Sequence, residues 1–509
     1  MLVRRMFKKI PLNGPKIFLP PSQALRKVVS KDGLGVYASA DTLFKGAVFG
    51  RDSLEVAEDL LHISPRLVRQ IILTLASLQG EAESNRNEEE LGRIIHEYRH
   101  TTVDGKPLGK ISAQIFRDLS KKWGGTKDEL AYYGSIDATP HFIRVLGKYC
   151  QAYGPEILSR NVTLRSGDQL PLLLVLENSL NWLVDKLEQS ESGLLEFKRK
   201  NPHGIENQVW KDSKEFYIHE NGEIVNHRRP IASIEVQALV YDALILGGEM
   251  LPSKAAKLSK KAKSVQDKTL KLLWRADEKY FSLGLDYDRK GKQRIIQTLT
   301  ANPAEMLDSY FFDDLPEDQK QHYVSEIVRE IMGLEFLTDS GVRSRALSEA
   351  RLVSFWDYHG SFTSWPKETY DIAKGLRRWQ LPKLADELEN RLLNVVKSLR
   401  SYPEFIYVDA RGRVLGLPKP AHHHGELVIV DSGNKPEKIQ AWTVSAIMSI
   451  NASRPLMSRK KHAVQQPWQR ELETEVLRAI PRVRRLRSAK ELAARYPDYP
   501  TMLAGQEHP

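Results

Sequence analysis

Residues 49–80, FGRDSLEVAEDLLHISPRLVRQIILTLASLQG, contain two helical patterns separated by a short turn. In Ser53–His62 and in Pro65–Leu78, apolar residues recur at positions i, i+3 and i+4, which is the spacing of one helix face. Ser64 is suited to the N-cap and Pro65 to the first helical position, so a second helix begins soon after the first ends. We therefore expect an antiparallel helical hairpin.

Similar helical patterns continue along the chain and outnumber strand patterns. The best strand pattern is a hairpin of Lys279–Leu285 with Gln293–Ile296 around the turn 288–291. The chain is therefore predicted to be mainly α-helical. The further helical patterns cover Thr139–Tyr153, Leu170–Glu188, Ile234–Met250, Ala255–Trp274, Pro303–Phe312, Asp318–Met332, Lys367–Trp379, Lys383–Leu399 and Ala441–Asn451.

The loops that precede these helices fall into two sets. Plain connections with lysine and proline precede helices such as Ala255–Trp274 and Lys383–Leu399. If helices alternate between an inner and an outer ring, the inner helices present their N-terminal loops at one common mouth, which predicts a double-ring α-toroid. The other set of loops combines glycine, aromatic and charged or amide residues, and comprises Phe49–Ser53, Tyr132–Asp137, Trp210–Asp212, Tyr358–Ser361 and Ile439–Trp442.

The composition narrows the class of protein. The 509 residues are 41% hydrophobic and 28% charged, which is typical of an ordered globular chain. The single cysteine, Cys150, cannot form an intramolecular disulfide, and no secretory signal or membrane-spanning run is evident, so we expect a cytoplasmic protein without a membrane partner. The formal net charge of +11 permits a nucleic-acid partner, but no nucleic-acid-binding motif accompanies it, so we expect none.

The loop Asn207–Ser213 carries a candidate catalytic carboxyl group. Asp212 follows Trp210 by two positions and stands between Lys211 and Ser213, so it is either a solvated loop residue or part of a cleft. A mouth lined by aromatic, acidic and basic residues suits a sugar, because rings stack on its C–H faces and charged groups bind its hydroxyls. Hydrolysis of a glycosidic bond needs two carboxyl groups, one of which must keep its proton. Asp212 is the candidate for that acid.

An ordered set of motifs in this chain resembles the amylo-alpha-1,6-glucosidase (glycogen debranching enzyme) family. That family belongs to the six-hairpin glycosidases, with relatives among trehalases, glucoamylases and mannosylglycerate-type hydrolases. The resemblance runs from about residue 35 to residue 452. The motifs are Phe49–Asp52, Gly92–Arg99, Tyr132–Pro140, Asn207–Ser213, Ile231–Ala243, His359–Thr369 and Gln440–Trp442.

The resemblance implies an (α/α)6 toroid, a six-hairpin glycosidase fold with minor β-hairpins. It implies an inverting glycoside hydrolase for an α-glucosidic bond, with Asp212 as the general acid and Glu404 as the general base. Glu368 is the rival base. No metal and no cofactor are implied, and His422–His424 is interpreted as a loop feature.

The same resemblance places further side chains around the terminal sugar. Arg51 and Asp52 would bind its hydroxyls, and a rim and walls would surround it. We expect these walls to consist of His96, Glu97, Arg99, Tyr133, Asp137, Trp210, Lys211, Glu235, Gln237, His359, Trp365, Gln440 and Trp442.

Several departures from the family pattern leave the substrate open between a glucan, an oligosaccharide and a small glucoside. Family members usually carry an N-terminal β-rich domain, and only about 35 residues precede the matching region in this sequence. Trp365–Glu368 replaces a WPHD motif, and 408–437 is an insertion. An inactive carbohydrate-binding toroid and a phosphorylase on the same fold are alternatives. The oligomeric state is left open.

We expect three segments in this chain. These are an extended N-terminal segment over 1–35, the catalytic toroid over 36–452 and a basic extension over 453–509. Within the extension, Trp468–Ala479 and Ala489–Arg495 have helical patterns.

Overall fold

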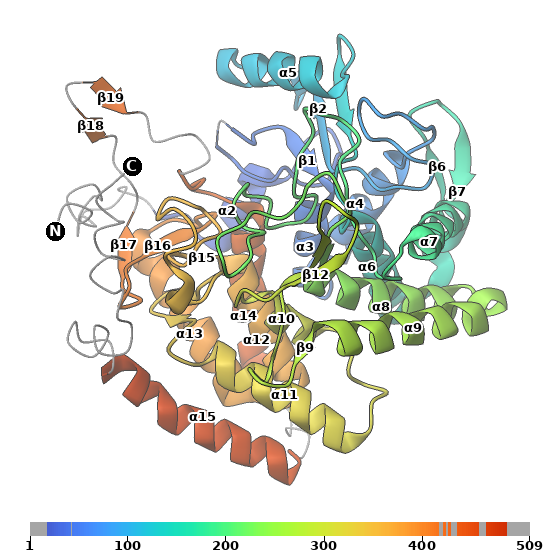
Figure 1. The fold of residues 1–509 in the computed structure, drawn as a ribbon. Helices are drawn as coiled ribbons and strands as arrows, with labels where there is room; N and C mark the ends of the chain where they lie inside the picture. The colour runs from blue at the N-terminus through green and yellow to red at the C-terminus, as the bar shows by residue number, and fades with distance from the viewer. Residues whose placement is uncertain are drawn as a thin grey trace.

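The computed structural model describes residues 18–41, 43–416, 421–423, 426–428, 435–457 and 465–485. Within these residues the protein is mainly helical, with short strands in the connections (Figure 1). The helices are α2 (Pro21–Val28), α3 (Gly50–Asp59), α4 (Pro65–Ser77), α5 (Lys110–Trp123), α6 (Ala138–Tyr153), α7 (Leu172–Gln189), α8 (Ile234–Met250), α9 (Ala255–Leu273), α10 (Asn302–Glu305), α11 (Glu317–Ile331), α12 (Pro366–Arg378), α13 (Pro382–Leu399), α14 (Ala441–Met457) and α15 (Pro467–Arg485).

Six helices form a closed inner ring. Each packs on the next in the order α3, α6, α8, α10, α12 and α14, and α14 packs back on α3. The outer helices α2, α4, α7, α9, α11 and α13 alternate with them along the chain. This arrangement confirms the predicted (α/α)6 toroid, in which every inner helix begins at the same mouth.

The residue pattern of each helix matches its ring. The inner helix α8 is apolar around most of its circumference and is buried along nearly its whole length, because neighbours surround it. The outer helix α9 buries one stripe that includes Leu258, Ala262 and Val265, while lysines such as Lys257 and Lys260 face solvent. The outer helix is therefore exposed to solvent on one side, whereas the inner helix is buried on nearly all sides.

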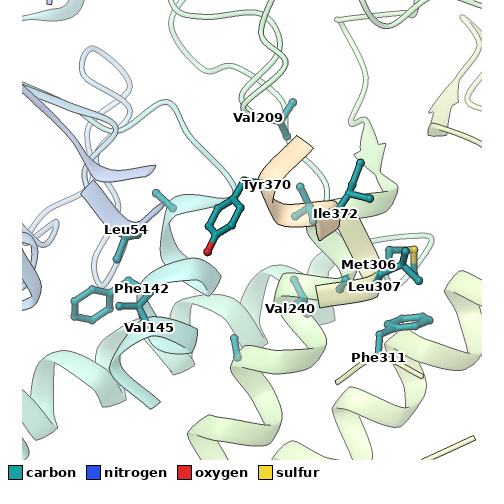
Figure 2. Close-up of a cluster of buried hydrophobic side chains, with 14 of the residues drawn as sticks. Leu54, Phe142, Val145, Val209, Val240, Met306, Leu307, Phe311, Tyr370 and Ile372 are labelled. Atoms are coloured by element: carbon teal, nitrogen blue, oxygen red, sulfur yellow. The ribbon is translucent and has the colours of Figure 1, made fainter. Parts of the chain in front are cut away.

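The hydrophobic core lies between the helices of the ring. Figure 2 shows Leu54 of α3, Phe142 and Val145 of α6, and Val240 of α8 within one buried cluster. Ile372 of α12 joins this cluster from the opposite part of the ring. Side chains far apart in sequence thus close the toroid by burial of apolar surface.

The strands are short and lie mostly in the loops. They are β1 (Ala47–Phe49), β2 (Glu97–His100), β3 (Thr102–Val103), β4 (Lys106–Pro107), β5 (Glu129–Tyr132), β6 (Asn161–Thr163), β7 (Gln169–Pro171), β8 (Ala232–Ser233), β9 (Trp274–Arg275), β10 (Tyr280–Phe281), β11 (Gly284–Tyr287), β12 (Gln293–Ile296), β13 (Leu337–Thr338), β14 (Gly341–Val342), β15 (Thr363–Ser364), β16 (Ile406–Val408), β17 (Val414–Gly416), β18 (Ala421–His423) and β19 (Glu426–Val428).

The predicted strand hairpin is confirmed with a shorter first strand. In β11 and β12, Gly284 pairs with Ile296 and Tyr287 pairs with Gln293. The preceding residues Tyr280–Phe281 pair with β9 instead. The predicted single strand is therefore divided between two partners, which a period-2 pattern cannot reveal.

Several predicted elements need correction. The extended segment over 1–35 is wrong for Pro21–Val28, which forms α2 and packs on α14. The predicted helix Pro303–Phe312 is wrong beyond α10 and the 3₁₀ turn Met306–Asp308. Helix α5 escaped prediction because its short apolar face packs on the strand β5, far from the ring.

The basic extension contains a helix that docks on the outer ring. Helix α15 packs on α11 and α13, with Trp468, Leu472 and Val476 buried. Ala489–Arg495 and His424 lie outside the described residues, and His422 and His423 belong to β18. Among the helices that the structure describes, none is long and apolar enough to cross a membrane.

Candidate active site

The motif loops predicted to share one mouth come together at the N-terminal ends of the inner helices. Asp52 lies in the first turn of α3, and Asp137 directly precedes α6. Asp212 lies in the long loop before α8, and Glu404 lies between α13 and β16. The carboxyl groups of this site therefore come from different sides of the ring.

Asp212 is held by a tyrosine that the sequence analysis did not select. The hydroxyl of Tyr358 donates a hydrogen bond of 2.9 Å to Oδ1 of Asp212. Burial raises the pKa of Asp212, while Arg51 and the Tyr358 hydroxyl act in the opposite direction. The only sequence signal for Tyr358 was its place beside His359 in a motif loop.

Glu404 is a partly exposed carboxyl group at the mouth whose pKa is raised well above its ordinary value. The backbone N–H of Glu437 donates to its Oε2 over 3.1 Å. Burial, and then the nearby carboxyl groups of Glu437, Asp52 and Asp212, raise the pKa of Glu404 to about 8. The ring of Tyr358, whose hydroxyl binds Asp212, lies 6.2 Å from that of Phe405, the residue after Glu404. The two candidate catalytic groups therefore belong to the same part of the mouth.

Asp52 lies in the same group of carboxyls. Nε2 of Gln440 donates to its Oδ1 over 3.1 Å, which joins the first inner helix to the last. Burial raises the pKa of Asp52 to about 7, and Glu55 and Asp212 add to the effect. The buried Oε1 of Gln440 has no hydrogen-bond partner among the described residues.

Arg51 supplies positive charge beside these carboxyls. Its Nη1 contacts Oδ2 and Oδ1 of Asp137 at 3.0 and 3.3 Å, and the Ser135 hydroxyl donates to Asp137 over 2.5 Å. Burial alone would raise the pKa of Asp137, but Arg51 and Ser135 hold it below its ordinary value. Burial and Arg51 lower the pKa of His96 to about 3, so its ring is neutral. Within the described chain, the buried Nδ1 of His96 has no hydrogen-bond partner.

Aromatic rings form a wall next to Asp212. Trp365 stacks on His359 with ring centroids 4.7 Å apart, and it lies 5.0 Å from Phe405 and 5.8 Å from Trp442. Trp210 meets His359 edge to face at 5.4 Å. Nε2 of His359 and Nε1 of Trp442 are buried without a hydrogen-bond partner in the part of the chain that the structure describes. Unsatisfied buried polar atoms are uncommon, and a bound polar ligand is one way to satisfy them.

Several predicted contact residues have internal partners instead. Tyr133 is 0% exposed and its hydroxyl donates to the carbonyl oxygen of Leu78 over 2.9 Å. Gln237 is also 0% exposed and bonds to the backbone of Leu195. This burial does not fit a direct contact with a substrate for either residue.

The predicted charged rim is also paired internally. Arg99 forms an ion pair with Glu97 on β2 and donates to the carbonyl oxygen of Leu43 over 3.2 Å. Glu235 accepts a hydrogen bond from Ser233. The structure thus brings these residues to the mouth as supports for its loops.

Lys211 and the rival base form a buried ion pair. Nζ of Lys211 contacts Oε1 of Glu368 and lies 2.8 Å from Oδ1 of Asn302. The second oxygen of Glu368 accepts a hydrogen bond of 2.9 Å from Ser344. Lys211 and Glu368 are each 0% exposed, so neither is accessible to a substrate in this structure.

A small charged cavity lies on the toroid axis below the mouth. It has a volume of about 40 Å³ and is lined by Arg51, Asp137 and Trp210 at one end. Residues Glu58 and Lys374 line its other end and also line a wider opening on the far side. Among the described residues, no group of histidine, cysteine, aspartate and glutamate could hold a metal ion.

Comparison with known proteins supports the fold. No protein-family model and no curated protein matches the chain. A GH63 mannosylglycerate hydrolase from Thermus thermophilus, in complex with Tris and D-glycerate, matches with a TM-score of 0.52 and 12% identity over 85% of this chain and 100% of that chain. A structure described as wild-type glycosidase matches with a TM-score of 0.51 and 11% identity over 86% of this chain and 96% of that chain. The likeness shows that this chain shares the toroidal fold of these proteins.

Proposed function

We propose that this protein is an inverting glycoside hydrolase that cleaves an α-glucosidic bond. Asp212 is the general acid that protonates the leaving oxygen. Glu404 is the general base that activates water once its carboxyl group is ionised, which its pKa of about 8 places at mildly alkaline pH. The observation that carries the proposal is that the ring of Tyr358, whose hydroxyl binds Asp212, lies 6.2 Å from that of Phe405, the neighbour of Glu404. Neither Asp212 nor Glu404 forms an ion pair within the described residues. The structural likeness to glycosidases adds support for the fold that such a site requires.

Inversion is the stereochemical outcome that the proposal assigns to this pair of carboxyls. Asp212 is bound by Tyr358 from the loop before α12, and Glu404 lies in the segment before α14. A sugar bound between them would meet the acid on one face and a base-bound water on the other. Inverting enzymes need a separation of about 6.5–9.5 Å for that water, wider than in retaining enzymes.

Glu404 suits the base better than Glu368. Both oxygens of Glu368 are occupied by Lys211 and Ser344, and the residue is 0% exposed. Glu404 is only partly buried, and no cation forms an ion pair with it among the described residues. Water can therefore reach Glu404 more readily than Glu368.

The burial of the sugar-binding groups favours a terminal sugar or a small glycoside as substrate. Arg51 is 8% exposed and Asp52 is 5% exposed, so little surface remains for a long chain to pass across them. A glucan would then be cleaved from its end. Because one structural neighbour is described as a mannosylglycerate hydrolase, mannosylglycerate and glucosylglycerate belong in any substrate panel.

The test is sugar release by the purified protein from isomaltose, maltose, panose, limit dextrin, trehalose, glucosylglycerate and mannosylglycerate. The anomer is followed by NMR, with Asp212→Asn and Glu404→Gln in parallel. Release of the inverted anomer by the wild type alone supports the proposal. A retained anomer, unchanged rates in either variant, or no release by the folded protein would contradict it, and a dependence on phosphate would indicate a phosphorylase.

A second measurement separates the two roles. A substrate with an activated leaving group needs little help from the acid, so it should largely restore turnover in Asp212→Asn. A small anionic nucleophile such as azide needs no base, so it should restore turnover in Glu404→Gln. Rescue in the opposite pattern would exchange the two assignments.

A further inference from the structure

The indole of Trp210 is held at three points. It precedes Asp212 by two positions and is 6% exposed. Its Nε1–H donates a hydrogen bond of 3.0 Å to Oε1 of Glu305 on α10. Two ammonium groups also lie over its ring, that of Lys211 at 4.8 Å and that of Lys367 at 4.7 Å from the centroid. Both distances are within the range of cation–π attraction.

Lys367 links this indole to three helices of the inner ring. Its Nζ lies 2.7 Å from Asp371 on its own helix α12, 3.0 Å from Glu55 on α3 and 3.3 Å from Glu305 on α10. Glu305 therefore holds both the ammonium group and the indole N–H. A buried ammonium group with three carboxylates around it has little freedom to move, so the ring beneath it is fixed as well.

The opposite end of the loop is free of this network. Asp212 has the single side-chain partner Tyr358 among the described residues and is partly exposed. The path of the backbone from Trp210 to Asp212 is short. Small movements of the indole are therefore transmitted to the carboxyl group.

We propose that Lys367 is a positioning residue that fixes Trp210 and thereby sets the place of the Asp212 carboxyl relative to the leaving oxygen. This inference rests on the proposed function. The simpler alternative is that Lys367 only holds the inner helices together. Lys374 offers a matched comparison, because it lies on the same helix α12 and shares Asp371, and it also pairs with Asp59. The ring it lies over is that of Tyr370, at 5.2 Å, and not that of Trp210.

The experiment compares Lys367→Met and Lys374→Met with the wild type on two substrates. One is the best unactivated glycoside of the panel and the other is the matching glycosyl fluoride, whose leaving group needs no proton. A misplaced acid loses rate on the first substrate and keeps most of it on the second. Because a displacement of about 1 Å can cost about 100-fold in rate, we expect Lys367→Met to change the ratio of the two kcat values by about 10-fold or more.

The controls separate positioning from stability. Lys374→Met should lower the thermal stability while leaving the ratio of kcat values unchanged. Lys367→Arg keeps the positive charge, so its ratio of kcat values should lie closer to that of the wild type than the ratio of Lys367→Met does. Equal losses on both substrates, or the same ratio change in Lys374→Met, would overturn the positioning role while leaving the proposed function intact.

Two further outcomes are decisive. If the wild type hydrolyses neither substrate, the proposed function fails and the role of Lys367 fails with it. If Lys367→Met does not fold, Glu305→Gln replaces it, since the amide oxygen still accepts from Trp210 while one carboxylate around Lys367 is lost. The expected result is a smaller change in the same ratio, and an unchanged ratio would contradict the inference.

Discussion

Two buried carboxyl groups, Glu404 at the mouth of the toroid and Glu58 in its interior, differ in the direction of their pKa shifts. In the interior, burial alone would raise the pKa of Glu58, but Arg144 and Lys148 hold it well below its ordinary value. Lys367 and Lys374 likewise overcome burial and lower the pKa of Asp371 to about 2. At the mouth, the pKa of Glu404 is raised to about 8. The difference lies in the partners, because both regions are buried.

The two kinds of buried carboxyl group have different roles, one in stability and the other in proton transfer. A buried carboxylate with close cations is locked in one charge state and holds helices together. A buried carboxyl group without such a partner costs stability but can exchange a proton near neutral pH. The interior is not uniform, since Asp59 shares Lys374 with Asp371 and burial raises its pKa to about 7. At the mouth, the raised pKa values of Asp212 and Glu404 coincide with partial exposure.

The strongest effect that we predict is on turnover. Asp212→Asn removes the proton donor and should lower kcat on unactivated glycosides by about 1,000-fold, within the usual range for general acid catalysis. The fold should be kept, as judged by circular dichroism and melting temperature. Asp185→Asn on the exposed face of α7 is the control. Wild-type turnover in a folded Asp212→Asn protein would show that Asp212 is not the general acid.

An interior substitution should instead act on stability. Glu58→Gln breaks contacts with Arg144 at 2.7 Å and with His141 at 3.0 Å, and it leaves buried positive charge without its partner. We expect the free energy of unfolding to fall by about 3 kcal/mol, measured by urea denaturation. The kcat of the folded fraction should stay within a few-fold of the wild type. Asp267→Asn, which breaks the exposed pair with Lys263, should change stability by less than about 1 kcal/mol.

Glu404 should make stability depend on pH. Its folded-state pKa of about 8 lies above the ordinary value of 4.5, so the native protein binds this proton more tightly than the unfolded chain. The resulting stability is fully present below pH 4.5 and is lost as pH rises through 8.

Glu404→Gln should remove this dependence. We expect the variant to gain about 2 kcal/mol relative to the wild type between pH 5 and pH 9, a value below the full linkage effect because the side chain is partly exposed. Unfolding curves at the two pH values measure it. A constant difference between the two proteins would show that Glu404 has an ordinary pKa.

The weakest effect concerns the tyrosine beside the acid. Tyr358→Phe removes the 2.9 Å hydrogen bond to Asp212, which should raise the pKa of Asp212 and cost about 1 kcal/mol of transition-state stabilisation. In a plot of kcat/KM against pH, the apparent pKa assigned to Asp212 should move to a higher value. Tyr153→Phe, whose hydroxyl donates to the carbonyl oxygen of Leu61, should leave the profile unchanged. A shift in both variants would argue against a specific role for Tyr358.

Local sequence patterns were enough to predict most helices of the two rings and the loops at the mouth. Periodicity of apolar residues is local, so Ile234–Met250 was predicted with the bounds that α8 has. Glycine, aromatic and charged residues in short loops marked the ends of the inner helices. Asp212 was selected from that pattern and from the family resemblance, and Glu404 was selected from the resemblance alone. Their catalytic roles stay predictions.

The pairing of charged residues, in contrast, depends on the folded ring. Lys211 looked like a flank of the acid in the sequence, but it is buried against Glu368, which is 157 positions away along the chain. Tyr133 and Gln237 also face the interior, where they bond to Leu78 and Leu195 from other elements. Helix α2 was missed because its stability comes from packing on α14 rather than from its own short pattern. Partner choice is set by closure of the ring, which brings together segments that no local pattern connects.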